Sequence, residues 1–123
     1  MTLSETYEKM GGNYKDVIGR FYSQDLVDRF LRKFPDDPAM QDLREAFAKG
    51  ESKDAFCAAH TLKGVCQSLA ISNLLRPLSL MTELLRKGDL EQARLLLPEA
   101  EKQYDITVNA IREYVADAQE PKK

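Results

Sequence analysis

Apolar residues recur along the chain three and four positions apart, the spacing that places them on one side of a helix. No stretch alternates convincingly between apolar and polar residues, as a half-buried strand would. Residues typical of caps and turns separate the apolar runs. The pattern therefore predicts a series of amphipathic helices joined by short turns.

Three helices are predicted in the first third of the chain, and the first two of them are short. Ser4, Asn13 and Ser23 can each cap one of them, because their side-chain oxygens can accept hydrogen bonds from free first-turn amides. Gly11-Gly12 ends the first helix. The apolar sides consist of Tyr7 and Met10, of Val17, Ile18 and Phe21, and of Leu26, Val27, Phe30, Leu31 and Phe34.

Two helices follow a proline-containing break. The first is expected over 38–49, with Asp37 as its N-cap and Pro38 in the first helical position. The second is expected to begin at a Ser52 cap and to run to about Leu69. The inward positions of the first are Met40, Leu43 and Phe47.

Two further helices complete the chain. Ser72 or Asn73 opens the first, and Pro77 is expected near its first turn, where a missing N–H costs least. The last helix is expected over about 90–116. One apolar stripe continues across Pro98, which predicts a single kinked helix rather than two. The inward positions are Leu74, Leu75, Leu78, Met81 and Leu85, then Leu97, Ala100, Tyr104, Val108, Ile111 and Val115.

Short turns between amphipathic helices favour antiparallel neighbours. The predicted fold is therefore all-α, an up-and-down antiparallel four-helix bundle with short additional N-terminal helices. We expect a single domain over 1–123, because 123 residues suit one domain with one core. The short helices are expected within 4–22, the bundle core within about 24–117, and a frayed polar tail over 118–123.

The charge balance limits the classes of partner. The 18 basic and 20 acidic residues give a net charge of -2 and a sequence pI near 5.5, which argues against general nucleic-acid binding. No run is apolar enough to span a membrane, and the first residues lack the layout of a signal peptide. We therefore expect neither a nucleic acid nor a membrane as partner.

The two cysteines point to a reducing compartment. Cys57 and Cys66 belong to one predicted helix, and their nine-residue separation spans roughly 13 Å, too far for a disulfide. Two unpaired thiols and no export signal favour the cytoplasm. Cys57 and His60 could share a helix face, but Cys66 cannot join them and the chain has no other Cys or His. No metal site is therefore predicted.

His60 is the only histidine, and it lies on the helix that follows Ser52. At about 100° per residue, His60 falls roughly 130–140° from the middle of the buried seam of that helix, so we expect it to be largely exposed. The seam consists of Ala55, Ala59, Leu62, Cys66 and Leu69. The residues on the side of His60 are Lys53, Phe56, Lys63, Gly64 and Gln67.

Gly64 is the residue of this face that most needs an explanation. An exposed histidine or lysine is most often plain surface. A glycine inside a helix costs about 0.5–1 kcal/mol relative to alanine. On an exposed face, packing within the domain is a poor reason for it, and close approach by another molecule beside His60 is a better one.

The residue types fit a phosphoryl acceptor. Neutral imidazole is a good nucleophile near neutral pH. Lys63 could stabilise an arriving anionic group, and Gly64 would leave space for its donor. The chain shows no triad around His60 and no glycine-rich phosphate loop, so phosphate would have to come from a protein.

The residues from His60 to Gly64 (HTLKG) resemble the signature of histidine-containing phosphotransfer domains (HPt domains) of two-component phosphorelays. Residues 54–59 and 84–93 and the long final helix also look like that family, so the resemblance covers most of the chain from about Ser23. The family often has small residues just after the glycine, where this chain has Val65 and Cys66, and often a glycine where this chain has Ala70.

The resemblance implies a helical bundle without a kinase, ATPase or phosphatase site. His60 would accept a phosphoryl group on Nε2 from a receiver-domain aspartate and pass it to another receiver, with Lys63 as the phosphate-stabilising cation and Gly64 as the clearance residue. The chain would need no cofactor, because the receiver would supply Mg²⁺. The implied partners are response-regulator receiver domains and/or a hybrid sensor kinase, with the chain itself a monomer.

Further residues are candidates for the surroundings of the site. In the family a polar side chain of the next helix often hydrogen-bonds the imidazole, and Ser79 and Thr82 are candidates here, with Gln67 a possible neighbour. Phe56 could form a docking surface beside His60, or could pack under the N-terminal helices. Those helices could cap the bundle and supply docking surface through Tyr7, Met10, Tyr14 and Phe21, while Leu80 and Leu84 could serve as interface or pack inward.

Two other functions remain open at the level of sequence. The chain could be a non-phosphorylated adaptor of the same fold that binds receivers or a kinase. It could also be a plain helical interaction protein with an incidental motif. Phosphate uptake on His60 separates the first function from both alternatives, and receiver binding separates the second from the third.

Overall fold

The computed structural model describes residues 1–119, and every regular element in that range is helical. The all-α prediction is therefore confirmed. Of the expected frayed tail, residues 118 and 119 belong to the last helix, and 120–123 lie outside the described residues. The elements are α1 (Leu3–Met10), α2 (Tyr14–Phe21), α3 (Gln24–Lys33), the 3₁₀ turn η1 (Phe34–Asp36), α4 (Ala39–Lys49), α5 (Ser52–Ser68), α6 (Ser72–Arg86), α7 (Leu90–Arg94) and α8 (Leu97–Gln119).

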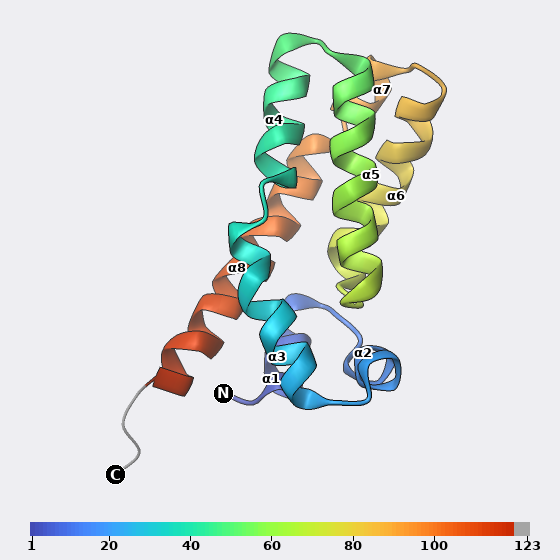
Figure 1. Cartoon of the computed structure of the whole chain (residues 1–123). Coiled ribbons are helices and arrows are strands. Elements are labelled where there is room, and N and C mark those ends of the chain that lie inside the picture. The colour runs from blue at the N-terminus through green and yellow to red at the C-terminus, as the bar shows by residue number, and fades with distance from the viewer. Residues whose placement is uncertain (120–123) are drawn as a thin grey trace.

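The long helices pack around one apolar core. Helix α5 packs against α4 and α6, and α6 packs in turn against α7 and α8. In Figure 1, α4, α5 and α6 lie side by side and are joined at alternate ends, so neighbours run antiparallel. The core includes Leu43 and Phe47 of α4, Leu62 of α5, Leu78 and Met81 of α6, and Ile111 of α8.

The N-terminal helices close the end of the bundle where α5 stops. The Tyr7 hydroxyl donates to the Leu69 carbonyl at 2.8 Å, and the Asn13 amide donates to the Ala70 carbonyl at 2.9 Å. These bonds satisfy carbonyls that the end of a helix leaves without partners. Tyr7 and Met10 are buried, so the expectation that they supply docking surface is wrong.

Some of the predicted helix N-caps are confirmed by the structure and others are wrong. Asn13 and Ser23 cap α2 and α3 as predicted. The cap of α1 is Thr2 rather than Ser4, because Thr2 and Glu5 form a reciprocal capping box. Helix α5 begins after Glu51 without a side-chain cap, so the predicted Ser52 cap is wrong.

The prediction of one kinked C-terminal helix is wrong, because α7 ends at Arg94 and α8 begins at Leu97. Pro98 explains the break, since its ring would clash with the carbonyl of Arg94 in a continuous helix and it has no N–H to donate. The apolar stripe nevertheless continues across the break. Pro77 lies beyond the expected first turn, inside α6, which continues through it.

Helix α3 is tied to the far end of α8. The Tyr114 hydroxyl donates to Asp28 at 2.6 Å, and Arg32 donates to the same carboxylate at 2.9 Å. Partial burial would raise the pKa of Asp28, but the hydrogen bonds from Tyr114 and Arg32 outweigh it and lower that pKa. The pair therefore anchors the N-terminal segment to the bundle.

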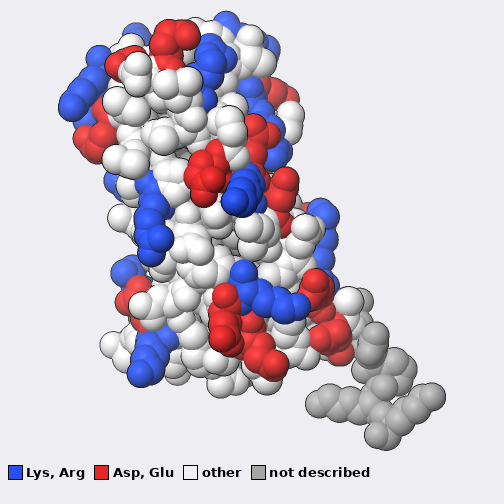
Figure 2. Space-filling view, turned by 180° about the vertical axis from the view of Figure 1, so that it is seen from behind, with Lys and Arg blue, Asp and Glu red and all other residues white. Residues whose placement is uncertain are grey.

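The surface carries both signs of charge in close alternation. Figure 2 shows Lys and Arg interspersed with Asp and Glu on the face behind the view of Figure 1. Two of the ion pairs join separate helices, Lys9 with Glu113 and Arg44 with Glu101. Over residues 1–119, no helix combines the length and apolar character needed to cross a bilayer.

Candidate phosphoacceptor site

Helix α5 presents His60 to solvent because the opposite side of the helix is the bundle seam. The seam residues Ala55, Ala59 and Leu62 are buried, and the two alanines are small enough to bring α5 close to its neighbours. His60 is exposed, as its angle from the seam predicts. Its imidazole makes no hydrogen bond to any residue in the described part of the chain.

Phe56 lies directly beside the imidazole. The rings of Phe56 and His60 stack with centroids 5.7 Å apart and planes inclined by 29°. The guanidinium carbon of Arg86, from the end of α6, lies 5.2 Å from the centroid of the same phenyl ring. The alternative that Phe56 packs under the N-terminal helices is wrong, because those helices bond to the other end of α5, about 20 Å along its axis.

Lys63 and Gly64 lie one turn beyond His60. Lys63 is half-buried and makes no ion pair with any residue between 1 and 119, so its ammonium group remains available to an anion. Gly64 is exposed, and a Cβ atom built there would have no described atom within 4 Å beyond its own helix. Gln67 is exposed one further turn along.

The two candidates on α6 do not hydrogen-bond the imidazole. Thr82 is buried, and its hydroxyl donates to the Leu78 carbonyl of its own helix at 2.7 Å. It therefore belongs to the core, and its expected role beside the imidazole is wrong. Ser79 is half-buried and makes no hydrogen bond to His60.

Arg86 is the neighbour of the site that the sequence reasoning missed. It follows Ser79 by seven residues, which is two turns of the same helix, so the two share the side that faces α5. That spacing is a usable signal. It identifies the contact only once the register of α6 against α5 is known.

The other interface candidates of α6 lie away from the site. Leu80 is 61% exposed and borders a hollow between α6 and α8, lined also by Pro77 and Leu96. Leu84 is half-buried against the core. Neither is brought to the His60 face.

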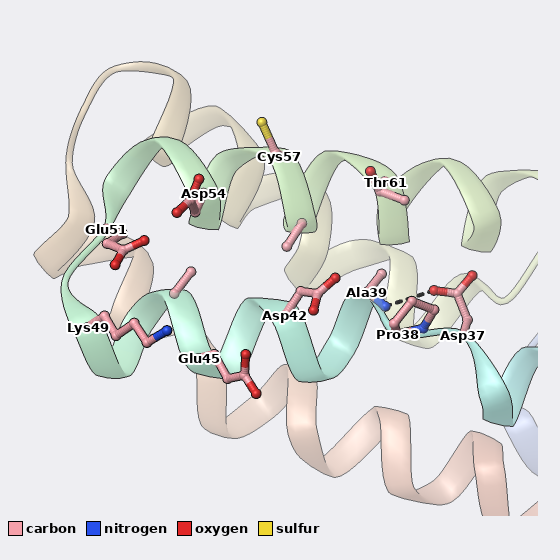
Figure 3. Close-up of a pocket in the computed structure, with 12 residues that line it drawn as sticks. Asp37, Pro38, Ala39, Asp42, Glu45, Lys49, Glu51, Asp54, Cys57 and Thr61 are labelled. Atoms are coloured by element: carbon pink, nitrogen blue, oxygen red, sulfur yellow. Dashed lines mark hydrogen bonds between the residues drawn. The ribbon is translucent and has the colours of Figure 1, made fainter.

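An acidic groove of about 500 Å³ runs between α4 and α5 on the side away from α6. Figure 3 shows carboxylates from both helices along it, together with Cys57 and Thr61. A hydrogen bond with Asp54 raises the pKa of the Glu51 carboxyl. The acidic residues that line the groove are Asp37, Asp42, Glu45, Glu51 and Asp54.

The site is therefore electrically asymmetric across α5. Carboxylates line the α4 side of α5, whereas Arg86 comes from α6 on the other side. At about 100° per residue, the helical angle places Lys63 on that second side as well. An anionic group that approaches His60 is repelled on the first side and attracted on the second. Within residues 1–119 no group of three or more His, Cys, Asp or Glu side chains could hold a metal ion.

The fold and the site define a class, a helical bundle that presents one histidine, a lysine and a glycine on an exposed helix face. The family model of the Hpt domain matches residues 25–120, which is most of the chain, and the chain belongs to that family. Comparison with curated proteins and with solved structures gave no match. Hpt domains carry phosphoryl groups in phosphorelays of two-component signalling, and this defines the general role of the chain.

Proposed function

We infer that the chain is a phosphorelay intermediate in which His60 accepts a phosphoryl group from the aspartate of one receiver domain and passes it to another. Membership of the Hpt family supports this role. The observation that carries the assignment to His60 is its exposure one turn from Gly64, whose missing side chain leaves open space. No other imidazole exists in the chain.

Uptake of the phosphoryl group by His60 is a substitution at phosphorus. The lone pair of Nε2 of neutral His60 forms the N–P bond while the P–O bond to the aspartyl carboxyl breaks, and the carboxylate leaves with that electron pair. The proton on Nδ1 stays in place, so no base has to act on the imidazole. Transfer to the second receiver is the reverse reaction, with its aspartate as nucleophile.

The neighbours of His60 have separable roles in this reaction. Lys63 stabilises the phosphoryl oxygens as the N–P bond forms, because an ammonium group within one turn attracts their charge. Gly64 leaves the space through which the receiver's aspartyl phosphate reaches Nε2. The Phe56 ring restrains the imidazole by stacking, which favours one orientation for attack.

The chain needs no cofactor in this proposal. Mg²⁺ bound to the receiver would neutralise part of the phosphoryl charge, and the described residues of this chain have no cluster that could hold the ion. The groups that this chain contributes are the nucleophile, one or two cations and a shaped surface.

Transfer of label tests the proposal. Receiver domains that carry ³²P on their aspartate are mixed with the chain and with its His60→Gln variant, and receiver binding is measured in parallel. We expect label on the wild type and none on His60→Gln, with binding retained by both. Binding without label on the wild type would instead identify an adaptor, and label on His60→Gln would place the phosphoryl group elsewhere.

A further inference from the structure

Leu80 of α6 is a large apolar side chain that neither the core nor the His60 face accounts for. It is 61% exposed and borders a hollow of about 320 Å³ between α6 and α8, the α6–α8 furrow. Among the described residues, α5 contributes none to the lining of this furrow. The lining comprises Asn73, Arg76, Pro77 and Leu80 of α6, then Leu96, and then Glu99 and Gln103 of α8.

The furrow lies between two helices that run in opposite directions (Figure 1). Its lining extends over about 10 Å of each helix. Leu80 is the last lining residue along α6 and Leu96 is the first on the α8 side, so the two lie at the same end of the furrow. By the same register, Arg76 lies level with Glu99 on the opposite rim.

The two rims of the furrow carry opposite charges. Arg76 on the α6 rim and Glu99 on the α8 rim are both exposed. Neither belongs to an ion pair within residues 1–119. Glu99 accepts a hydrogen bond from Gln103, one turn later in the same helix, at 3.1 Å. The furrow thus offers one basic and one acidic rim to a binding partner.

This surface is complementary to itself about a two-fold axis. An axis along the furrow, in the plane of contact, places α6 of each copy over α8 of the other. Arg76 of one copy then faces Glu99 of the other, and Leu80 of one copy enters the furrow beside Leu96 of the other. Each contact occurs twice, because a two-fold interface repeats every contact.

A second copy of the chain accounts for the apolar and the charged features of the surface together. Burial of Leu80 in the furrow removes apolar area from water, and each rim gains an opposite charge. Leu95, next to Leu96 in the chain, is 71% exposed, so apolar area continues past this end of the furrow. Contiguous exposed apolar residues mark contact surfaces, whereas isolated ones are ordinary.

We propose that the chain forms a two-fold symmetric dimer through the α6–α8 furrow. Because the furrow contains no described residue of α5, both His60 faces stay uncovered in the dimer. This dimer differs from the monomer expected from the family resemblance. The proposal does not depend on the proposed function, since none of its contacts involves His60, Lys63 or Gly64.

Sedimentation equilibrium of the full chain tests the dimer. The average mass of the wild type should rise from 14.0 kDa toward twice that value as the concentration increases from about 5 to 500 µM. Leu80→Asp should raise the dissociation constant at least about tenfold, because the dimer would bury an unpaired carboxylate. Circular dichroism establishes that each variant keeps the helical fold.

Tyr22→Asp is the matched control for the loss of an exposed apolar side chain. Tyr22 is 89% exposed, belongs to the N-terminal segment and does not line the furrow. The variant introduces the same charge as Leu80→Asp and should dimerise like the wild type. Equal weakening by both variants would indicate general apolar association and would overturn the proposal.

An exchange of charges tests the two-fold pairing of the rims. Arg76→Glu makes both rims acidic, and Glu99→Lys makes both rims basic. Each variant alone should dimerise about tenfold more weakly than the wild type. In an equimolar mixture the acidic copy should pair with the basic copy, which restores the wild-type dissociation constant to within about threefold. A mixture that stays as weak as its components would overturn the pairing.

Two further outcomes would overturn the proposal. The first is a wild type that remains at 14.0 kDa at every concentration. The second is slower phosphate uptake from a phosphorylated receiver by Leu80→Asp, which would make the furrow part of the receiver contact. The dimer predicts uptake at the wild-type rate. If His60 takes up no phosphate from any receiver, the proposed function fails and the sedimentation results still decide the dimer.

Discussion

The imidazole of His60 stacks on the phenyl ring of Phe56, one helical turn earlier in α5, with ring centroids 5.7 Å apart. Arg86 of α6 covers the same phenyl ring at 5.2 Å. The nucleophile, an aromatic support and a cation from the neighbouring helix thus meet in one cluster. Phe56 links α6 to the orientation of the imidazole.

Phe56→Leu should slow phosphotransfer without unfolding the chain. An aromatic pair contributes about 0.5–1.5 kcal/mol beyond burial, so we expect the limiting rate to fall about three- to tenfold. Rapid-quench kinetics with a saturating phosphorylated receiver measures that rate. Phe56→Tyr keeps the stacked ring and should transfer at close to the wild-type rate; equal rates for all three proteins would show that the stack has no role.

Gly64 should show opposite effects on stability and transfer. Gly64→Ala should raise the free energy of unfolding by about 0.5–1 kcal/mol, because the site is helical and a Cβ atom meets nothing there. Gly64→Gln should fold equally well and transfer phosphate at least about tenfold more slowly, because its side chain occupies the approach to His60. Urea denaturation and transfer kinetics measure the two effects, and full activity of Gly64→Gln would remove the clearance role.

The positive charge of Lys63 should increase the rate of phosphoryl transfer to His60. Lys63→Gln loses a charge-assisted contact to the phosphoryl oxygens, a loss of about 1.5–3 kcal/mol that corresponds to roughly 10- to 100-fold in rate. Lys53→Gln is the matched control, because Lys53 is an exposed lysine of the same helix two turns before His60. Rapid-quench assays measure the transfer rates of both variants against the wild type. Equal slowing of the two variants would indicate a general field effect instead of a specific contact.

The contact between Tyr114 and Asp28 predicts how the anchoring of α3 depends on pH. Tyr114→Phe removes the 2.6 Å hydrogen bond to a carboxylate and should lower the free energy of unfolding by about 1 kcal/mol at neutral pH. The folded pKa of Asp28 is lowered, so this contribution is present above the ordinary carboxyl pKa and is lost as the pH falls through the lowered value. Partial burial, followed by the Asp28 contact, raises the pKa of Tyr114 to about 12. The tyrosine contribution is therefore full below its ordinary pKa and is lost as the pH rises through about 12.

Urea denaturation of the wild type and of Tyr114→Phe across this pH range measures the difference. It should be largest near neutral pH and shrink at both ends. A difference that is constant from acid to alkaline pH would contradict the assigned contact. Tyr22→Phe is the control, because its ring is exposed and it should show no effect at any pH.

The exposed position of His60 could be predicted from sequence because it depends on one helix alone. The seam with Ala59 and Leu62 fixes which side of α5 is buried, and His60 follows from the helical angle. Arg86 could not be found in this way, because its contact with Phe56 depends on the register between two helices. Periodicity within either helix contains no information about that register.

The errors about helices have a related cause. The apolar stripe across Pro98 persists, since side chains on both sides of the break pack on one core, but the backbone at proline cannot continue the helix. Phe30 lies on a correct apolar stripe and is nevertheless 44% exposed, because Phe21 of α2 covers only part of its ring. A pattern of apolar positions thus shows which side is apolar and leaves open what covers it.

The most direct measurement of the central claim is the location of the phosphoryl group after incubation with a phosphorylated receiver. Trypsin should release residues 54–63, which follow Lys53, end at Lys63 and contain the only histidine. Mass spectrometry under alkaline conditions should find an acid-labile phosphoryl group on this peptide, and an unphosphorylated second receiver should remove it. An unmodified 54–63 peptide, or a phosphoryl group that persists in His60→Gln, would contradict the account.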